Sequence, residues 1–206
     1  MSSANRGPKI SLSEEYPTPP WVVDRFLEER LADLPISSSS RWIEPCAGSG
    51  AIIKTVNSLV EPNPTWTAAE VLPKYRQELI KVVPARRVFI ENFLTTDFDT
   101  RFDVAITNPP YSLAYRVIQK SLRIADWVVM LLRVNWLGSD SRQKFLSTFA
   151  PDVHVLPNRP SFSTDGATDS TEYGWFVWGP PPRKRHQGAV TVLNTTPRAV
   201  RLQQRG

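Results

Sequence analysis

The sequence has 206 residues, of which 41% are hydrophobic and 22% charged, so it can bury an ordinary core and is not of the disordered class. A chain of this length accommodates one domain. Its only cysteine, Cys46, excludes an internal disulfide and indicates a reducing compartment. It has neither an apolar run of membrane-spanning length nor a signal-peptide core. We therefore expect a cytoplasmic protein without membrane contact.

The net charge of +5 is unevenly spread along the chain. From position 183 onward no acidic residue occurs, whereas the basic residues there are Arg183, Lys184, Arg185, Arg198, Arg201 and Arg205. Such a stretch suits a polyanion, because each neutralised phosphate releases counterions. The alternative is a solvated tail. The charge permits a nucleic-acid partner but does not by itself establish one.

The predicted elements begin with a helix over 19–34, with Thr18 as its predicted N-cap and prolines in its first turn. After a polar connector, near-continuously apolar segments of strand length alternate with helix-like segments. The predicted strands are 41–46, 66–71, 87–90, 102–107 and 126–132, and the predicted helices between them are 50–59, 74–83 and 112–124. This alternation predicts a parallel sheet with right-handed crossovers.

The pattern changes after a further predicted helix over 139–149. Two strands, 153–156 and 173–178, follow without a helix between them, which predicts antiparallel partners at the sheet edge. Segment 189–193 is a candidate final strand. We expect an α/β fold with a mostly parallel, seven-stranded sheet and an antiparallel edge hairpin. The expected organisation is a flexible N-terminus over 1–15, one domain over 16–180 and a basic C-terminal extension over 181–206.

A run of small residues, Glu44-Pro45-Cys46-Ala47-Gly48-Ser49-Gly50, lies where the first predicted strand ends and a helix begins. Glycines let the backbone turn tightly and approach a ligand closely. The carboxyl end of such a strand is where ligands of open α/β sheets bind. The run is neither the six-residue dinucleotide fingerprint nor a phosphate-binding loop with its lysine. By itself it is compatible with any mononucleotide binder or with a plain tight turn.

Two later segments extend this candidate cofactor site. Glu70, followed by Val71, lies at the end of the next strand, where an acid accepts hydrogen bonds from ribose hydroxyls. The alternative for Glu70 is a surface carboxylate. After the third strand, Asn92 is a candidate ligand for an adenine amino group and Phe93 for its ring. A loop turn with a core-facing Phe93 explains the same residues.

The strongest pattern is Asn108-Pro109-Pro110-Tyr111, directly after the fourth predicted strand. The prolines stiffen the chain and leave carbonyls without competing donors. Asn108 supplies a further carbonyl acceptor, and Tyr111 supplies an aromatic face. Two acceptors and a stacking surface suit an amino group conjugated to a ring, whose lone pair becomes available when both N–H bonds are accepted. The alternative is a rigid loop.

These residues resemble the S-adenosylmethionine-dependent DNA adenine-N6 methyltransferases, in particular the small phage and bacterial enzymes. The resemblance covers about 16–178 and implies a Rossmann-like class I methyltransferase fold with S-adenosylmethionine as cofactor. It implies that Asn108, Pro109, Pro110 and Tyr111 are catalytic. The cofactor residues that it implies, together with the segments above, are Tyr16, Thr18, Pro19, Glu44, Pro45, Cys46, Ala47, Gly48, Gly50, Glu70, Val71, Asn92, Phe93 and Asn108.

The resemblance also implies a partner, duplex DNA with a flipped adenine, in a bacterial cell or phage-infected host, and a homodimer is compatible with so small an enzyme. The expected substrate-binding residues are Tyr111, Arg159, Phe162, Asp169, Arg183, Lys184 and Arg185. No protein metal site is expected, because one cysteine and two distant histidines do not provide one. The family often has Asp where this chain has Asn92, and no separate target-recognition domain is present.

Three alternatives share the same motifs. Asn-Pro-Pro-Tyr also occurs in methyltransferases of ribosomal RNA bases and of protein glutamine side chains. The third is a non-catalytic nucleic-acid-binding protein on this fold, in which we would expect damage to a motif, such as the loss of Asn108 or a bulky residue at Gly48.

Overall fold

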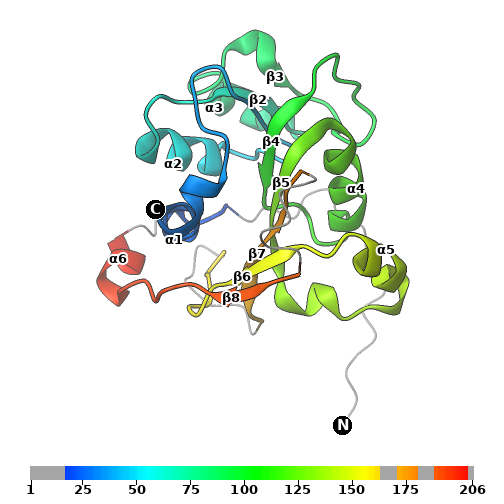
Figure 1. The fold of residues 1–206 in the computed structure, drawn as a ribbon. Helices are drawn as coiled ribbons and strands as arrows, with labels where there is room; N and C mark the ends of the chain where they lie inside the picture. The colour runs from blue at the N-terminus through cyan, green and yellow to red at the C-terminus, as the bar shows by residue number, and fades with distance from the viewer. Residues whose placement is uncertain (1–16, 163–170, 181–187, 204–206) are drawn as a thin grey trace.

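The computed structural model of the chain describes residues 17–162, 171–180 and 188–203. A central sheet separates two helical layers, with α1, α2 and α3 on one face and α4 and α5 on the other (Figure 1). This is the α/β architecture that the alternation of apolar segments predicted. No helix among the described residues is both long and apolar enough to cross a membrane.

The sheet has eight strands, in the order β3-β2-β1-β4-β5-β7-β6-β8. Their bounds are β1 Arg41–Glu44, β2 Thr65–Ala69, β3 Val88–Phe89, β4 Phe102–Thr107, β5 Ala125–Arg133, β6 Asp152–Val155, β7 Tyr173–Trp178 and β8 Val190–Val192. Only β7 pairs antiparallel, with β5 on one side and β6 on the other. The mostly parallel sheet is confirmed.

One detail of the predicted sheet is wrong: the described residues form eight strands rather than seven, because β8 pairs with β6 in parallel register. The predicted antiparallel pair β6–β7 lies near the edge of the sheet, next to the edge strand β8. An edge strand presents unpaired backbone groups, and β8 pairs with those that β6 would otherwise expose.

Most of the observed helices lie where the sequence predicted them, but several are shorter than predicted. They are α1 Pro20–Arg30, α2 Ala51–Leu59, α3 Arg76–Leu79, α4 Ala114–Ile124, α5 Gln143–Thr148 and α6 Arg198–Gln203. The predicted helix 74–83 is only one α-helical turn preceded by a 3₁₀ turn, and α5 is also preceded by one. Helix α6 was not predicted, because its six residues are too short for a periodic pattern.

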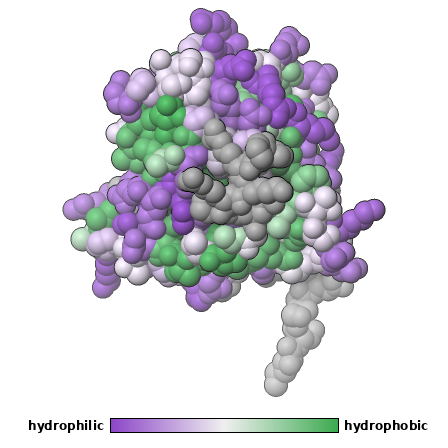
Figure 2. All heavy atoms as spheres, in the orientation of Figure 1, coloured by the Kyte–Doolittle hydropathy of each residue, from purple (hydrophilic) through white to green (hydrophobic). Residues whose placement is uncertain are grey.

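Alternate residues of the strands pack on opposite faces of the sheet. Trp42 and Val104 contact the layer of α1 and α2, whereas Ile43 and Ala105 contact the layer of α4. Both layers are apolar, so the inner strands are buried on both faces, as the continuous apolar runs predicted. The sheet edge at β8 differs, since Val190 and Val192 are exposed. Figure 2 shows hydrophobic residues gathered along the lower side of this view, the side where β8 lies in Figure 1.

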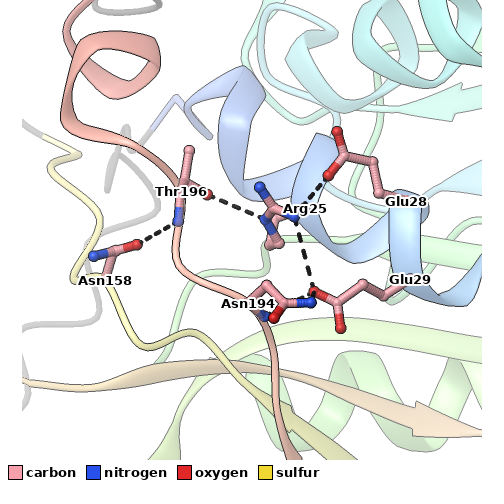
Figure 3. A network of polar contacts seen from close by, with 6 residues as sticks. All are labelled: Arg25, Glu28, Glu29, Asn158, Asn194 and Thr196. Atoms are coloured by element: carbon pink, nitrogen blue, oxygen red, sulfur yellow. Dashed lines mark hydrogen bonds and ion pairs between the residues drawn. The ribbon is translucent and has the colours of Figure 1, made fainter.

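Polar contacts fasten the segment after β8 to α1 and to the segment after β6. Arg25 of α1 donates to the Thr196 hydroxyl at 3.3 Å, and Glu29 accepts from the Asn194 backbone at 2.8 Å (Figure 3). The Thr196 backbone N–H in turn donates to Asn158 at 2.7 Å. The C-terminal segment is thus held against α1, and the residues just before this helix, Pro17 and Thr18, line the functional site described below.

Removing the indole donor of Trp175 should destabilise the protein, because this side chain joins α1 to the sheet. Trp175 is fully buried, stacks on Phe26 and donates to the Val22 carbonyl at 3.0 Å. We expect Trp175→Phe to lower the free energy of unfolding by about 1–3 kcal/mol, measured by urea denaturation. The exposed Val190→Thr should change it by less than about 0.5 kcal/mol. Equal effects of the two substitutions would contradict this role of Trp175.

Candidate active site

A pocket opens at the carboxyl ends of β1, β2, β3 and β4, where the predicted site segments meet. The predicted residues on its wall are Thr18, Glu44, Pro45, Cys46, Ala47, Gly48, Glu70, Val71, Asn92, Phe93, Asn108, Pro109 and Pro110. Pro19, Gly50 and Tyr111 lie near the pocket in sequence but do not line it. Tyr16 lies outside the described residues. Parallel strands gather these segments, because all of them end at one edge of the sheet.

The glycine turn depends on backbone conformations that favour glycine. Gly48 and Gly50 have φ angles of 50° and 77°, in the left-handed region. A Cβ on Gly48 would meet no atom within 4 Å, so its position borders open space, whereas one on Gly50 would lie 3.2 Å from Leu79 Cδ2. Because Gly48 has no side chain, the space beside its backbone stays open to the pocket. The absence of a side chain at Gly50 lets the start of α2 lie close to α3.

Glu70 joins the loops that follow β1 and β2. One carboxylate oxygen accepts the Gly48 N–H at 2.7 Å, and the other accepts the Leu72 N–H at 2.8 Å. Glu70 is buried and lies on the pocket wall. Each carboxylate oxygen has more than one acceptor site, so these bonds are compatible with the predicted bonds from ribose hydroxyls.

Glu44, at the end of β1, is a buried acid beneath the glycine turn. Burial, above all, raises the pKa of its carboxyl well above the ordinary value, and the nearby Glu70 charge raises it further, against a bond from the Ile53 backbone. Its Oε2 has no hydrogen-bond partner among the described residues. Burial likewise raises the pKa of the Cys46 thiol, which leaves the thiol protonated and unsuited to act as a nucleophile.

The segment after β3 supplies an apolar wall. Phe93 is buried and lines the pocket, with the Lys120 ammonium of α4 5.2 Å from its ring centroid. Lys120 also donates to the Thr96 carbonyl. The exposed Asn92 lines the pocket too, but its side-chain oxygen accepts the Leu94 N–H at 3.0 Å, a turn bond. Phe93 therefore has a fixed position, and the predicted adenine contact of Asn92 stays a prediction.

The structure brings the N-terminal segment against the Asn-Pro-Pro-Tyr motif. Asn108 Nδ2 donates to Thr18 Oγ1 at 3.2 Å, and Thr18 is buried. The prediction that Thr18 caps α1 is wrong: Pro19 holds that position, and no side chain caps the helix. The bond to Asn108 orients the amide, so that its nitrogen faces Thr18 and its oxygen is the group suited to accept from a target.

The rest of the motif starts α4. The Pro110 carbonyl accepts the Leu113 N–H at 2.9 Å and the Tyr111 carbonyl accepts the Ala114 N–H at 3.4 Å. These bonds close the turn that precedes the helix. The buried Pro109, on the pocket wall, then provides the backbone carbonyl that remains a candidate acceptor within the motif.

Tyr111 lies in an aromatic group beside the pocket rather than on its wall. Its ring centroid is 6.0 Å from that of Tyr173, which is 5.0 Å from that of Phe162. The Arg133 guanidinium lies 4.5 Å from the Tyr111 ring centroid. The structure therefore brings the predicted substrate residues Tyr111 and Phe162 together through Tyr173, and adds Arg133. We define Tyr111, Arg133, Phe162 and Tyr173 as the aromatic cluster.

The other predicted substrate residues are less closely tied to the site. Arg159 is exposed and forms an ion pair with Glu172 at 2.5 Å. Asp169, Arg183, Lys184 and Arg185 lie outside the described residues. Within the described residues, no group of three or more His, Cys, Asp or Glu side chains is arranged to hold a metal ion.

Several residues of the site were not predicted. The pocket-lining residues that were not among the predicted site residues are Pro17, Ser49, Ala51, Ile52, Leu72, Tyr75, Glu91, Leu94, Leu113 and Val117. Most of them adjoin predicted residues in the sequence, and this proximity could have identified them. Nothing in the sequence marks Tyr75 or Arg133 as a site residue, because their positions depend on how distant segments pack.

Comparison with known proteins identifies the fold. No protein-family model matches the sequence, and no curated protein is significantly similar to it. Solved structures do match. A Listeria monocytogenes protein assigned as a class I S-adenosylmethionine-dependent methyltransferase has a TM-score of 0.66 at 12% identity, covering 95% of this chain and 72% of that one.

Two further solved structures with a similar fold carry the names of enzymes that act on nucleic acids or belong to a restriction-modification system. A Pyrococcus horikoshii protein assigned as an RNA methyltransferase matches with a TM-score of 0.63 and 19% identity over 87% of this chain and 91% of its own. The methyltransferase subunit of a type I restriction-modification system from Streptococcus thermophilus gives 0.66 and 15%, over 92% of this chain and 52% of that one. The Rossmann-like class I methyltransferase fold is thereby confirmed.

A side chain at Gly50 should destabilise the protein more than one at a glycine with an ordinary φ. Gly50 has a φ of 77° and its Cβ would press on Leu79, whereas a Cβ on Gly138 would meet only the Asn135 carbonyl oxygen at 3.8 Å. We expect Gly50→Ala to lower the free energy of unfolding by about 1–3 kcal/mol, with Gly138→Ala near neutral. Urea denaturation measures both, and equal values would refute the explanation.

The raised pKa of Glu44 predicts a pH dependence of stability. The folded protein binds this proton more tightly than the unfolded chain, so the contribution is fully present below the unfolded pKa, about 4.3, and is lost as pH rises toward the folded pKa. Glu44→Gln should therefore gain stability relative to wild type as pH rises, by at most about 1.4 kcal/mol per pH unit. Parallel pH–stability curves of the two proteins would contradict this.

Proposed function

We propose that this chain, which has the class I methyltransferase fold, transfers a methyl group from S-adenosylmethionine to the exocyclic amine of a nucleic-acid base, adenine N6 in DNA. The observation that carries the proposal is the orientation of Asn108 by Thr18 at the end of the pocket. Asn108 and Pro109 line the pocket, and Tyr111 of the aromatic cluster follows them two residues later in the chain. The experiment that tests it is direct methyl transfer to DNA.

The pocket residues fit S-adenosylmethionine. Open space beside Gly48 accommodates a ligand close to the backbone, and the Glu70 carboxylate is placed for ribose hydroxyls. Phe93 provides an apolar wall for a purine ring. Glu44, a buried acid on the pocket wall with an oxygen that no described residue satisfies, would be able to form a hydrogen bond with a ligand there. When bound, this cofactor would supply an electrophilic methyl group.

The chain's own residues would prepare the target amine. The amine of an aromatic base is a poor nucleophile, because its lone pair is drawn into the ring. Asn108 Oδ1 and the Pro109 carbonyl would accept its two N–H bonds and favour a pyramidal nitrogen whose lone pair faces the cofactor side of the pocket. Positioning would supply most of the acceleration, and no strong general base is required.

The aromatic cluster favours a base over a glutamine side chain as the target. Tyr111, Tyr173 and Phe162 form contiguous ring contacts next to the motif. Tyr173 and Phe162 are buried, so the half-buried Tyr111 would be the ring on which a base stacks. An aliphatic amide would not use this ring. The basic C-terminal residues support a polyanionic substrate, and Arg198 and Arg201 lie on α6.

Transfer of labelled methyl from S-adenosylmethionine to unmethylated duplex DNA, followed by nucleoside analysis, tests the proposal. We expect label in N6-methyladenine. Single-stranded DNA, structured RNA and a glutamine-containing peptide are run beside it as acceptors. Label in RNA or in the peptide, and none in DNA, would replace the proposed substrate with the one that is labelled.

Variants of Asn108 test the residue at the centre of the proposal. Asn108→Ala removes the acceptor and should lower kcat by a factor of about 10²–10³. Asn108→Asp keeps an acceptor oxygen of the same size and should retain more activity than Asn108→Ala. Thr18→Val, which removes only the group that orients the amide, should cause a smaller loss. Full activity of Asn108→Ala would refute the assignment.

A further inference from the structure

Arg133 occupies the ring on which a target base is expected to stack. Its guanidinium carbon lies 4.5 Å from the Tyr111 ring centroid, a cation–π contact. Tyr111 itself is not on the pocket wall, although the preceding residues Asn108, Pro109 and Pro110 are. In this structure the Tyr111 ring is therefore engaged by a cation before any base arrives.

The fold fixes Arg133 at this place. Strands β4, β5 and β7 run side by side (Figure 1), and Thr107 of β4 is the register partner of Met130. Arg133 is three residues beyond Met130 and so lies level with the end of the Asn-Pro-Pro-Tyr motif. On its other side, Arg133 is the register partner of Tyr173, and its Nε donates to the Tyr173 hydroxyl at 3.1 Å.

Tyr173 is a rigid anchor for this arrangement. Its side chain is fully buried, and the Phe162 ring packs edge-on against it. Arg133, by contrast, is only half-buried. The guanidinium is thus the member of the aromatic cluster that can move without opening the core, and a base that stacks on Tyr111 would compete with it for the ring.

The chemistry of guanidinium decides which substrates can displace it. If the guanidinium left the aromatic ring only to be hydrated by water, little binding free energy would be gained. A phosphate, in contrast, offers the guanidinium two charge-assisted hydrogen bonds. A nucleotide in a strand carries phosphates beside its base, so it brings the replacement partner with it. A free nucleoside or an uncharged side chain does not.

We propose that Arg133 is a specificity-determining residue: it exchanges the Tyr111 ring for a backbone phosphate next to the incoming base, and so admits polynucleotides in preference to uncharged amines. This inference rests on the proposed function and names the feature of the substrate that this chain reads. It assigns a role to a residue outside every motif of the sequence.

The salt dependence of binding tests the exchange without requiring catalysis. Binding of a fluorescein-labelled duplex of mixed sequence is followed by anisotropy in the presence of S-adenosylhomocysteine, over a range of salt concentrations. Arg133→Gln should weaken binding about tenfold. It should also reduce the slope of log Kd against log salt by about one phosphate equivalent, ~0.9 for a duplex.

Two variants serve as controls. Arg133→Lys keeps the charge and should keep the slope while binding more weakly than wild type. Arg101→Gln removes the same charge next to the start of β4, at the opposite end of the strands, where Arg101 pairs with Asp126, and should leave the slope unchanged. An unchanged slope in Arg133→Gln would overturn the proposal, as would a loss of slope in Arg101→Gln of the same size.

A second measurement needs no variant. Deoxyadenosine monophosphate should displace the labelled duplex from the wild-type protein at a concentration at least about tenfold lower than deoxyadenosine. Equal competition would overturn the proposal. Its failure can be told from that of the proposed function: methylation of DNA with an unchanged slope removes only the role of Arg133. An Arg133-dependent slope without methylation removes only the reaction.

Discussion

The site of this protein depends on one constraint, the common end of parallel strands that are buried on both faces. β1, β2, β4 and β5 all run in one direction, so the segments that follow them meet at one edge. Both faces of these strands are covered and mostly apolar. Most polar groups of the pocket therefore lie at the carboxyl ends of the strands and in the loops beyond them.

Hydrogen bonds between those loops then set the geometry. Glu70 holds the glycine turn to the loop after β2, and Asn108 holds the loop after β4 to the N-terminal segment through Thr18. In each case the hydrogen bond, from Gly48 to Glu70 or from Asn108 to Thr18, joins two residues of the pocket wall that come from different segments of the chain. The pocket wall and the Asn108 side chain are consequently positioned by the same small set of contacts.

Local patterns predicted the parts of the structure that local physics determines. The apolar runs located β4 and β7 at the residues where they occur, since a strand covered on both faces is apolar throughout. The small residues from Glu44 to Gly50 identified the turn because left-handed φ angles favour glycine. Asn108 and its prolines marked the second half of the pocket.

The remainder depended on contacts between distant residues. Thr18 reads as a helix cap in sequence, but its hydroxyl serves Asn108, ninety positions away in the chain. The predicted number of strands was one too few, because β8 follows the basic residues 183–185 in the chain and pairs with β6. Arg133 looks like the ordinary end of a strand, and only the register of β5 with β4 and β7 places it on Tyr111.

The central claim, that the pocket at the carboxyl edge holds S-adenosylmethionine, is tested most directly by calorimetric titration with that compound, on wild type and Glu70→Gln. The account predicts one binding site in the wild-type protein. We also expect an affinity at least about tenfold lower in the variant, because an amide N–H₂ would replace a carboxylate oxygen that accepts from the backbone and that would accept from the ribose of a bound cofactor. No binding by the wild-type protein, or equal binding by both, would contradict it.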